Sequence, residues 1–516
     1  MSENHTELDK NFKSSPRLSK YFVFLLTIIG VSLLVRLYYF PFDVPLSSDA
    51  LYYFWYSSDI YQIKELPSDW TPGNNGWPIF VSFFFSLFDS KDILTFMQIQ
   101  RLLAVLFSIL ISVPVYFLCK KFVSKKFALI GATLIAFDPR LMINSFLGVT
   151  DPLYLLLIAT SLTVFLFSNK KLVYFSFVLA SFAIIVRGEG IFFFVVLSIL
   201  FFIRYRKEGY SIIFRYLAVI GIFTLIILPI SIYRMDVSGT DSIFVRSVVS
   251  ATDVLSDIEK SEDISDNIIL NGSKIFMQYL IWILIPTFII FIPLGIFLIF
   301  KNRNFDKNAI ILSAGIMMIP AFYAYTIPAL DTRYLYVLFP MFSVLAVLAI
   351  EKFSQKLNRP NIIIIGIIFA VVIASLVFFD QQKIDYEHEK EAFEIMNDVS
   401  PMVKGVNSLG KELRYFSTVQ TIEQWPALYS EMNFDTTIIP VTEFNNLENF
   451  INATKDGGLT HIIVDDSKTN PTFLRDIFLE ENNYSYLNKI YDSKIDGFNY
   501  HVKVFEIDYQ SFSNMN

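Results

Sequence analysis

The chain has 516 residues, of which 54% are hydrophobic and only 17% are charged. Soluble proteins carry about 25% charged residues, so this composition excludes an ordinary soluble enzyme and indicates a membrane protein. The formal net charge of −6 and the lack of a long basic block argue against a nucleic-acid partner. The single cysteine, Cys119, excludes an internal disulfide.

Long apolar runs rich in Phe, Ile and Leu follow a polar segment at residues 1–20. Runs of this length suit helices, which satisfy their own backbone hydrogen bonds in lipid. No small-residue cleavage site follows the first run, so we expect an uncleaved anchor. We predict a mostly α, polytopic transmembrane bundle with about 11 spans, near residues 21–40, 102–119, 127–146, 152–168, 172–186, 191–203, 212–233, 275–300, 309–327, 334–350 and 361–379.

Basic residues indicate which connections face the cytoplasm. Lysine and arginine occur in alternate loops, near residues 120, 169, 204, 301 and 351, and the positive-inside rule places these loops inside. The segment 1–20 is also basic near the first span and is expected to be cytoplasmic. An odd number of crossings then leaves the chain after residue 380 outside. We therefore predict a multi-pass protein of the cell membrane with a cytoplasmic N-terminus and an external C-terminal domain.

The remaining connections of the membrane domain, residues 21–380, are long and expected to be external. They include a first loop at 41–101 and an acidic loop at 234–274. Within the first loop, WPIFVSFFFSLF at residues 77–88 is too short to span, so we expect it to lie in the membrane interface or to re-enter.

Residues 381–516 are polar and charged, unlike the rest of the chain. A helical pattern at EKEAFEIMNDV precedes two β-rich runs, TTIIPV and THIIVDD, and a second helical pattern at FLRDIFLEENN. This alternation predicts a separate external α/β domain. Glycosylation sequons begin at Asn271, Asn452 and Asn483, in segments expected to be external.

Charged side chains gather near the external ends of the predicted spans. Most of the cations are arginines, although burying a charge in lipid costs roughly 2.5 to 3.5 kcal/mol. Arginine binds phosphate oxygens through its planar fork, and interleaved carboxylates offer a general base. The pattern indicates group transfer from a lipid phosphate, while an interfacial anchor or a loop ion pair is the alternative for any single residue. The residues are Asp43, Asp49, Arg101, Asp138, Arg140, Asp151, Arg187, Glu189, Arg234, Asp331 and Arg333.

Four short motifs resemble the GT-C superfamily of integral-membrane glycosyltransferases, nearest the dolichyl-phosphate-mannose protein mannosyltransferases and related polyprenyl-phosphate-sugar transferases. SSDALYYFWY matches the acidic position in their first external loop through Asp49. DPRLMINSFLGVTDPLY matches a second acidic position, at the start of a later span, through Asp151 and Pro152. VRGEG resembles their RPEG turn with Gly188 in place of proline, and TRYLYVLFP resembles their late RY span.

The resemblance implies protein glycosylation or a related reaction, in which a hexosyl or mannosyl group moves from a polyprenyl (dolichyl) phosphate donor to a hydroxyl acceptor. It implies that Asp49 is the general base and that Arg187 and Arg333 bind the departing phosphate. Asp151 then orients the acceptor or a bound cation; its alternative role is to cap the helix at 152–168, because Asp-Pro is a good helix start. We expect Arg140 and Arg101 as further donor-phosphate ligands, and we expect Asp43, Asp138, Glu189 and Tyr334 to support the site.

Two departures from the family pattern limit the prediction. Oligosaccharyltransferase relatives carry WWDYG in their soluble domain, whereas the tail here has only EQWPALY, so transfer of a preassembled oligosaccharide is not expected. Ala50 follows Asp49 where protein mannosyltransferases commonly have an acidic pair, which leaves a lipid, a protein and a glycan open as acceptors.

No cofactor is predicted with certainty. The four histidines are scattered and form no zinc motif, while a divalent cation bound by carboxylates stays open. The sequence GVNSLGKE has the spacing of a phosphate-binding loop but lacks the Ser or Thr that binds magnesium. A transporter of an anionic or lipid-linked substrate and an assembly protein are the alternative functions. Charge on one face, without repeat symmetry, favours the enzyme.

Overall fold

The computed structural model describes residues 20–68, 70–88, 90, 92–168, 171–239, 241, 262–301, 303–326, 330–355, 360–382, 384–403, 444–455, 459–468 and 470–515. The chain divides into two compact units. The first, here called the membrane unit, comprises Met1–Phe40, Tyr56–Phe85 and Gln100–Lys383. The second, here called the C-terminal unit, comprises Pro41–Trp55, Ser86–Ile99 and Ile384–Asn516. The predicted domain boundaries at 380 and 381 stay a prediction.

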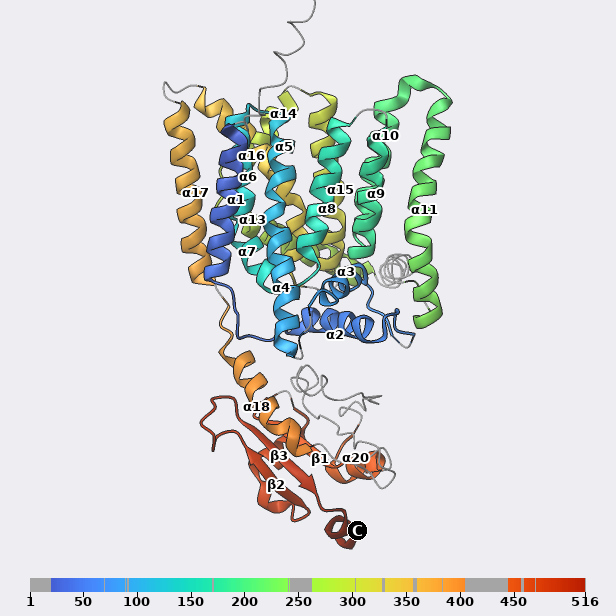
Figure 1. Cartoon of the computed structure of the whole chain (residues 1–516), viewed down its shortest axis with the longest axis vertical. Helices are drawn as coiled ribbons and strands as arrows, with labels where there is room; N and C mark the ends of the chain where they lie inside the picture. Colours follow the sequence, from blue (N-terminus) through green and yellow to red (C-terminus); the bar gives the residue numbers. More distant parts are fainter. Residues whose placement is uncertain are drawn as a thin grey trace, which may run out of the picture. The chain divides into compact units, whose positions relative to one another are not determined.

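Helices make up the membrane unit, and the long ones run side by side as a bundle (Figure 1). Two helices, α2 (Ser48–Ile63) and α4 (Ile93–Leu110), begin in the C-terminal unit and end in the membrane unit. The others are α1 (Lys20–Tyr38), α3 (Gly76–Phe85), α5 (Ser112–Lys120), α6 (Lys125–Ala136), α7 (Pro139–Phe146), α8 (Asp151–Phe167), α9 (Val173–Val186), α10 (Gly190–Tyr205), η1 (Arg206–Glu208), α11 (Ser211–Ser238), α13 (Glu262–Leu284), α14 (Phe291–Lys301), α15 (Phe305–Thr326), η2 (Thr332–Leu338), α16 (Phe339–Ser354) and α17 (Pro360–Gln382).

Six described helices are long and apolar enough to cross a membrane, or seven if the bent pair α6–α7 counts as one span. Shorter apolar helices, among them α8 and α9, pack beside them. The chain is therefore an integral membrane protein, while the predicted number of about 11 spans stays a prediction.

Three predicted spans differ in detail from the structure. The span predicted at 275–300 is two helices, α13 and α14, because Pro286 cannot donate a backbone hydrogen bond at the break. The span predicted at 127–146 bends by 45° between α6 and α7. At this bend Asp138 caps α7, since its Oδ1 accepts hydrogen bonds from the backbone N–H groups of Arg140 (3.0 Å) and Leu141 (3.2 Å). The span predicted at 334–350 begins as the 3-10 helix η2.

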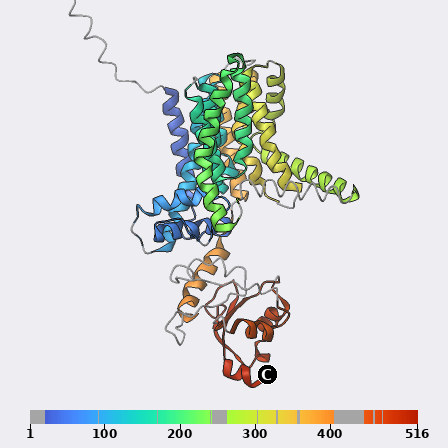
Figure 2. The same cartoon turned by 90° about the vertical axis from the view of Figure 1, so that its right-hand side faces the viewer.

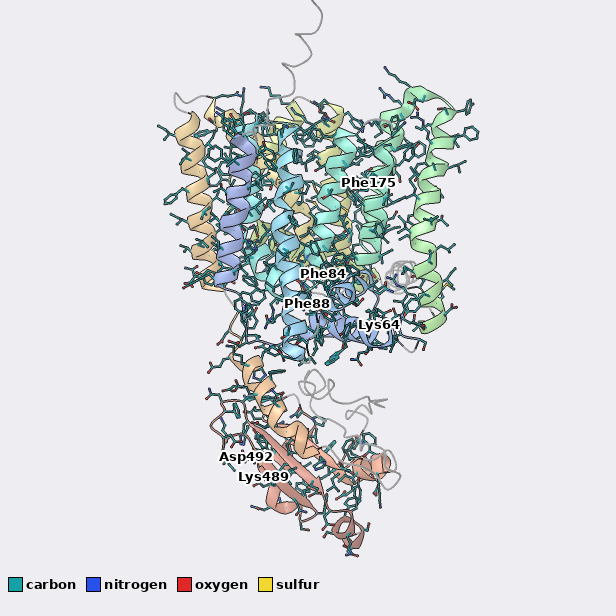
Figure 3. The ribbon with its side chains drawn as sticks, viewed as in Figure 1. Lys64, Phe84, Phe88, Phe175, Lys489 and Asp492 are labelled. Carbon is teal, nitrogen blue, oxygen red and sulfur yellow. The ribbon has the colours of Figure 1, made fainter. Side chains whose placement is uncertain are left out.

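Burial separates central helices from peripheral ones. Most side chains of α8 and α16 are buried, whereas Val219 and Ile227 are the only apolar side chains that α11 buries. The helix α11, drawn in green, lies at one edge of the bundle in Figure 1 and in front of it in Figure 2. Exposed apolar side chains such as Phe175 on α9 cover the bundle surface (Figure 3). Such a surface is suited to contact with lipid.

The C-terminal unit contains an antiparallel sheet of the three strands β1 (His461–Asp465), β2 (Leu487–Asp492) and β3 (Val502–Ile507), in the order β1-β3-β2. In register, His461 of β1 pairs with Glu506 of β3, and Leu487 of β2 pairs with Ile507. Side chains such as Phe450 and Leu474 form its core. Its elements are α18 (Glu387–Val403), α20 (Leu447–Thr454), β1 (His461–Asp465), α21 (Thr472–Leu479), η5 (Glu481–Asn483), β2 (Leu487–Asp492), β3 (Val502–Ile507) and α22 (Tyr509–Met515).

The sequence pattern anticipated part of this unit. THIIVDD forms β1, and the two predicted helices are α18 and α21. TTIIPV lies outside the described residues, and the strands β2 and β3 were not predicted. The helix α18 is joined to the sheet region through Glu391, whose carboxylate accepts hydrogen bonds from the backbone N–H groups of Asn499 (3.0 Å) and Tyr500 (2.7 Å).

Candidate active site

A recess in the membrane unit collects several of the charged residues predicted for the site. It lies among α8, α15, η2 and the turn between α9 and α10, and is here called the arginine recess. Its lining residues are Asp151, Tyr154, Leu155, Arg187, Glu189, Met317, Pro320, Arg333, Tyr334, Tyr336 and Val337.

Asp151 is the most deeply buried charged side chain of this recess, with only 3% of it exposed. Its Oδ1 accepts a hydrogen bond from Nη1 of Arg187. Its Oδ2 lies 3.9 Å from Nη1 of Arg333 and 3.5 Å from Nδ2 of Asn144. The helix α8 begins at Asp151 itself, and Thr150 occupies the cap position without a side-chain hydrogen bond. The alternative role of Asp151 as the helix cap is therefore wrong, because its carboxylate faces two guanidinium groups instead.

Arg187 ends α9 with an extended backbone (φ −148°, ψ 126°), and α10 begins three residues later at Gly190. Its guanidinium donates to both carboxylate oxygens of Glu189, with Nη2–Oε1 at 3.1 Å and Nε–Oε2 at 3.4 Å. It also lies 5.8 Å from the ring centre of Tyr154 and 5.7 Å from that of Tyr334. These contacts fix the guanidinium from several sides.

The short turn after Arg187 also places Glu189 beside the Arg187 guanidinium, which lowers the pKa of the Glu189 carboxyl. Burial alone raises the pKa of its carboxyl, but the charge and hydrogen bond of the Arg187 guanidinium outweigh this effect and hold that pKa below its usual value. Glu189 is therefore ionised at neutral pH.

Arg333 is the more exposed of the two arginines, with a side chain 25% exposed against 12% for Arg187. Asp331 holds it on two sides. Oδ1 of Asp331 accepts from the backbone N–H of Arg333 at 2.8 Å, and Oδ2 accepts from Nε at 2.5 Å. Two guanidinium groups from different elements thus approach one buried carboxylate, and each also pairs with a second carboxylate, that of Glu189 or Asp331. Guanidinium groups are the side chains that bind phosphate by charge-assisted hydrogen bonds.

The other predicted phosphate ligands lie outside the lining of the arginine recess. Arg140 donates to the backbone carbonyls of Ile285 and Trp282 (2.6 Å for the latter), at the end of α13. Nε of Arg101 donates to the carbonyl of Phe146, at the end of α7, at 2.7 Å. Guanidinium groups satisfy helix-end carbonyls well, so these contacts give both arginines a structural role. Their predicted role as donor-phosphate ligands stays a prediction.

The two acidic residues predicted in the first loop belong to the C-terminal unit. Asp49 is exposed in the first turn of α2, and Asp43 is exposed in the segment before this helix. Asp138 is buried at the α6–α7 bend, where it caps α7 as described above.

Sequence reasoning missed two polar neighbours of Asp151. Tyr154 follows it by three residues, so helical spacing places both on one side of α8 and could have indicated Tyr154. Asn144 comes from α7, and no local signal indicated it. Among the described residues, no group of three or more His, Cys, Asp or Glu side chains is arranged to hold a metal ion. The described residues therefore do not identify the ligands of a divalent cation.

No protein-family model matches the sequence, and no curated protein matches it. Solved structures do match its fold. The oligosaccharyltransferase of Archaeoglobus fulgidus, solved with Zn and sulfate, is 13% identical, and the match covers 85% of this chain and 68% of that chain with a TM-score of 0.57. AglB from A. fulgidus, solved with an inhibitory peptide and a dolichol-phosphate, is 12% identical and covers 87% and 70%, with a TM-score of 0.52.

ArnT from Cupriavidus metallidurans, bound to undecaprenyl phosphate, matches over nearly the whole of both chains. The identity is 10%, the match covers 94% of this chain and 98% of that chain, and the TM-score is 0.59. AglB and ArnT are GT-C glycosyltransferases, and likeness at these identities shows the fold. This integral membrane protein has the GT-C glycosyltransferase fold, which confirms the resemblance seen in its motifs.

Proposed function

We propose that this protein is a glycosyltransferase that moves a monosaccharide from a polyprenyl phosphate donor to a hydroxyl acceptor on the external face of the membrane. The observation that carries the proposal is the arginine recess, in which Arg187 and Arg333 approach Asp151 within the GT-C fold. The neighbours support a lipid phosphate as the donor group, because ArnT was solved with undecaprenyl phosphate and AglB with a dolichol-phosphate.

In the proposed reaction the acceptor hydroxyl oxygen bonds to the anomeric carbon of the sugar. The bond between that carbon and the phosphate oxygen breaks, and its electron pair leaves with the polyprenyl phosphate. Arg187 and Arg333 bind this phosphate and stabilise the charge that grows on it. A general base must take the proton of the acceptor hydroxyl. The family resemblance implies Asp49 for this role, and Asp49 belongs to the C-terminal unit, so its part in the reaction stays a prediction.

Asp151 has a different proposed role from the one predicted. Its carboxylate pairs with Arg187 and approaches Arg333, so we assign it to holding both guanidinium groups rather than to orienting the acceptor or a cation. Asp331 and Glu189 complete this arrangement, each on one arginine. The sugar, whether mannose or another hexose, and the acceptor are left open by the residues of the recess.

The test is a transfer assay on membranes that contain the full chain. Polyprenyl-phosphate-linked mannose and other hexoses, labelled in the sugar, are supplied, and the label is followed into lipid, protein and glycan fractions. Asp49→Asn keeps the size of the side chain but removes the proton acceptor, so we expect turnover to fall by roughly two to four orders of magnitude with donor binding retained.

The matched control for this test is Glu65→Gln, an exposed carboxylate just after α2, which should transfer normally. Label that stays on the donor in every fraction would contradict the proposal. Movement of intact donor across a proteoliposome membrane, without sugar transfer, would favour the transporter instead.

A further inference from the structure

One short segment of the membrane unit contacts both turns that carry the arginine recess. This segment, residues 74–77 with the sequence NNGW, lies at the start of α3. We propose that it is a positioning element that sets the spacing between Asp151 and Arg187. The inference rests on the proposed function, because it concerns how the donor site is held together.

The first contact is with the turn between Arg187 and Glu189. Oδ1 of Asn74 accepts a hydrogen bond from the backbone N–H of Gly188, the residue between them, at 3.3 Å. Gly76 meanwhile packs against the end of α9. A Cβ on Gly76 would lie 2.8 Å from the backbone carbonyl carbon of Ile185, so any larger residue forces the end of this helix to move. Close packing at Gly76 thus fixes the distance between the segment and the end of α9. The hydrogen bond of Asn74 fixes the turn between Arg187 and Glu189.

The second contact is with the loop that leads into Asp151. Trp77 is completely buried, and its Nε1 donates to the backbone carbonyl of Gly148 at 3.1 Å. Gly148 has a positive φ of 77°, which favours glycine, and precedes Asp151 by three residues. Gln100 donates to the same carbonyl at 2.8 Å. The loop before Asp151 is therefore held by two side-chain donors.

The segment itself is anchored by Arg234, a predicted outer-face residue that lies outside the arginine recess. Nη2 of Arg234 donates to Oδ1 of Asn75 at 2.5 Å, and its Nη1 lies 3.7 Å from Oδ1 of Asp241. Both Asn75 and Arg234 are almost fully buried. Arg234 thus acts through Asn75 on the segment rather than on a phosphate.

This connection has a functional consequence because Asp151 and Arg187 come from different helices. Their ion pair requires the end of α9 and the start of α8 to keep a fixed separation. A shift of about 1 Å at a positioned group can lower turnover by about 100-fold. Residues 74–77 bond to both backbones at the points where that separation is set.

The experiment compares Asn74→Ala, Asn74→Asp and Trp77→Phe in the transfer assay with the full chain. Asn74→Ala should lower kcat about tenfold with little change in the thermal unfolding temperature, while Asn74→Asp, which keeps an acceptor oxygen, should restore most of it. Trp77→Phe keeps the ring but removes the donor to Gly148 and should show a smaller loss. If Asn74→Ala does not fold, the other two variants carry the test.

Ser161→Ala is the matched control, because Ser161 joins α8 to α9 through a 2.7 Å hydrogen bond to the carbonyl of Ser176 and does not line the recess. A double-mutant cycle with Arg187→Lys separates positioning from general stability. If Asn74 acts through Arg187, Asn74→Ala should cost much less in the Arg187→Lys background than alone. Ser161→Ala should leave kcat unchanged in both backgrounds.

Three results would overturn the inference. Full activity of Asn74→Ala and Trp77→Phe, with Arg187→Lys impaired, would reject positioning while the proposed function stands. An undiminished effect of Asn74→Ala in the Arg187→Lys background would show that Asn74 does not act through Arg187. Normal transfer by Arg187→Lys and Arg187→Ala alike would instead reject the proposed function and the inference with it.

Discussion

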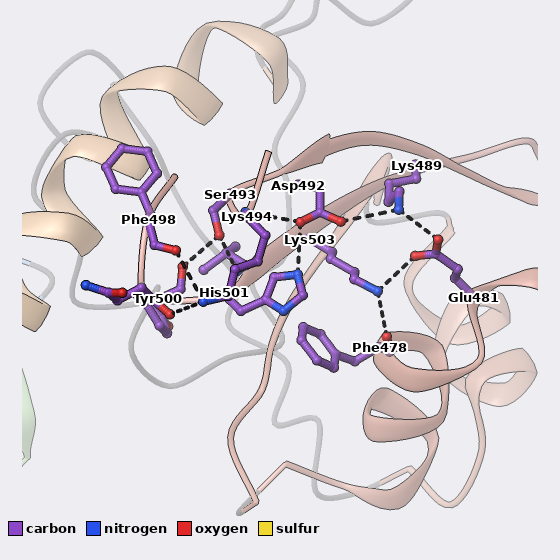
Figure 4. A network of polar contacts seen from close by, with 12 residues as sticks. Phe478, Glu481, Lys489, Asp492, Ser493, Lys494, Phe498, Tyr500, His501 and Lys503 are labelled. Carbon is purple, nitrogen blue, oxygen red and sulfur yellow. Dashed lines mark hydrogen bonds and ion pairs between the residues drawn. The ribbon is translucent and has the colours of Figure 1, made fainter. Parts of the chain in front are cut away.

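Two clusters of alternating charge, one in each unit, differ in how they are built. In the arginine recess, Asp151, Arg187 and Arg333 come from three different elements, and the Asp151 side chain is 3% exposed. In the C-terminal unit the cluster is local to η5 and the strands β2 and β3 (Figure 4). There Lys489, labelled in Figure 3, lies 2.7 Å from Glu481, with side chains 32% and 27% exposed.

The other ion pairs of the C-terminal cluster are also within hydrogen-bond distance. Lys503 lies 3.0 Å from Glu481, and Asp492 lies 2.9 Å from His501 and 3.3 Å from Lys489. Ion pairs that water reaches contribute about 0.2 to 1 kcal/mol each, because water already solvates the charged groups. Breaking a buried pair costs about 3 to 5 kcal/mol, since it leaves a charge without compensation.

This difference in burial indicates which of the two charge clusters has a functional role. Apolar residues of similar volume often stabilise a protein as well as a buried ion pair does, so stability alone gives little reason for charges in the arginine recess. An anionic ligand gives such a reason. The side chains of the C-terminal cluster are 12% to 32% exposed, and none is buried as Asp151 is. Modest stabilisation of the sheet explains these ion pairs.

The largest expected effect is that of Arg187→Ala on transfer. Removing a donor that stabilises developing charge lowers turnover by about 100- to 1,000-fold, and we expect a loss of this size. Arg187→Lys should retain part of the activity, because an ammonium keeps the charge but not the fork. The kcat of the purified full chain is the measurement, and Lys489→Ala is its control. A loss for Lys489→Ala equal to that for Arg187→Ala would remove the distinction between the clusters.

A smaller effect is expected for Asp151→Asn, which preserves size but removes the charge that holds both guanidinium groups. We expect turnover to fall by roughly 10- to 100-fold, as expected for displaced catalytic groups, without loss of folded protein. Steady-state kinetics and the thermal unfolding temperature are measured on the same sample. Near-normal transfer would mean that Asp151 only begins α8 and contributes nothing to the site.

The smallest effect is expected for Glu481→Gln, which should leave transfer unchanged and lower the stability of β2 and β3 by about 0.2 to 1 kcal/mol at pH 7. Hydrogen bonds from Lys489 and Lys503 lower the pKa of the Glu481 carboxyl below its usual value of 4.5. A lowered pKa gives stability that is present above pH 4.5 and is lost as the pH falls through the folded-state pKa. Hydrogen exchange of the two strands should therefore separate wild type from variant at pH 7 and not in strong acid.

Much of the membrane unit could be predicted because hydropathy and charge are local properties of a sequence. Asp151, Arg187, Glu189, Arg333 and Tyr334 were all predicted site residues, and the structure brings them together in one recess. This prediction came from the motifs, because each motif contains a charged residue near the start or end of a predicted helix.

Arg140 and Arg101 were also predicted for the site, but they do not line the recess. A local pattern places an arginine near a helix end but does not say whether it faces a cavity or the carbonyls of another helix. Both guanidinium groups bond to helix-end carbonyls, at Trp282 and Phe146 respectively. The choice depends on tertiary contacts 45 to about 145 residues apart in the chain, which the local pattern does not contain.

The strand β2 was not predicted because it also depends on tertiary contacts. β2 reads LNKIYD, with buried residues at only Leu487 and Tyr491, so it lacks a clear alternation. Its pairing with β3 also shifts register between Lys489 and Tyr491. An irregular edge strand of this kind is defined by its partner rather than by its own residues.

The central claim is that the arginine recess binds the phosphate of a lipid carrier, and equilibrium binding tests it most directly. Undecaprenyl phosphate and dolichyl phosphate are titrated into the purified full chain, its Arg333→Ala variant and the control Lys503→Ala. We predict saturable binding. Arg333→Ala should weaken it about tenfold or more, because a charge-assisted contact is lost, and Lys503→Ala should leave it unchanged. Equal affinity of the wild type and Arg333→Ala for both lipids would contradict this claim.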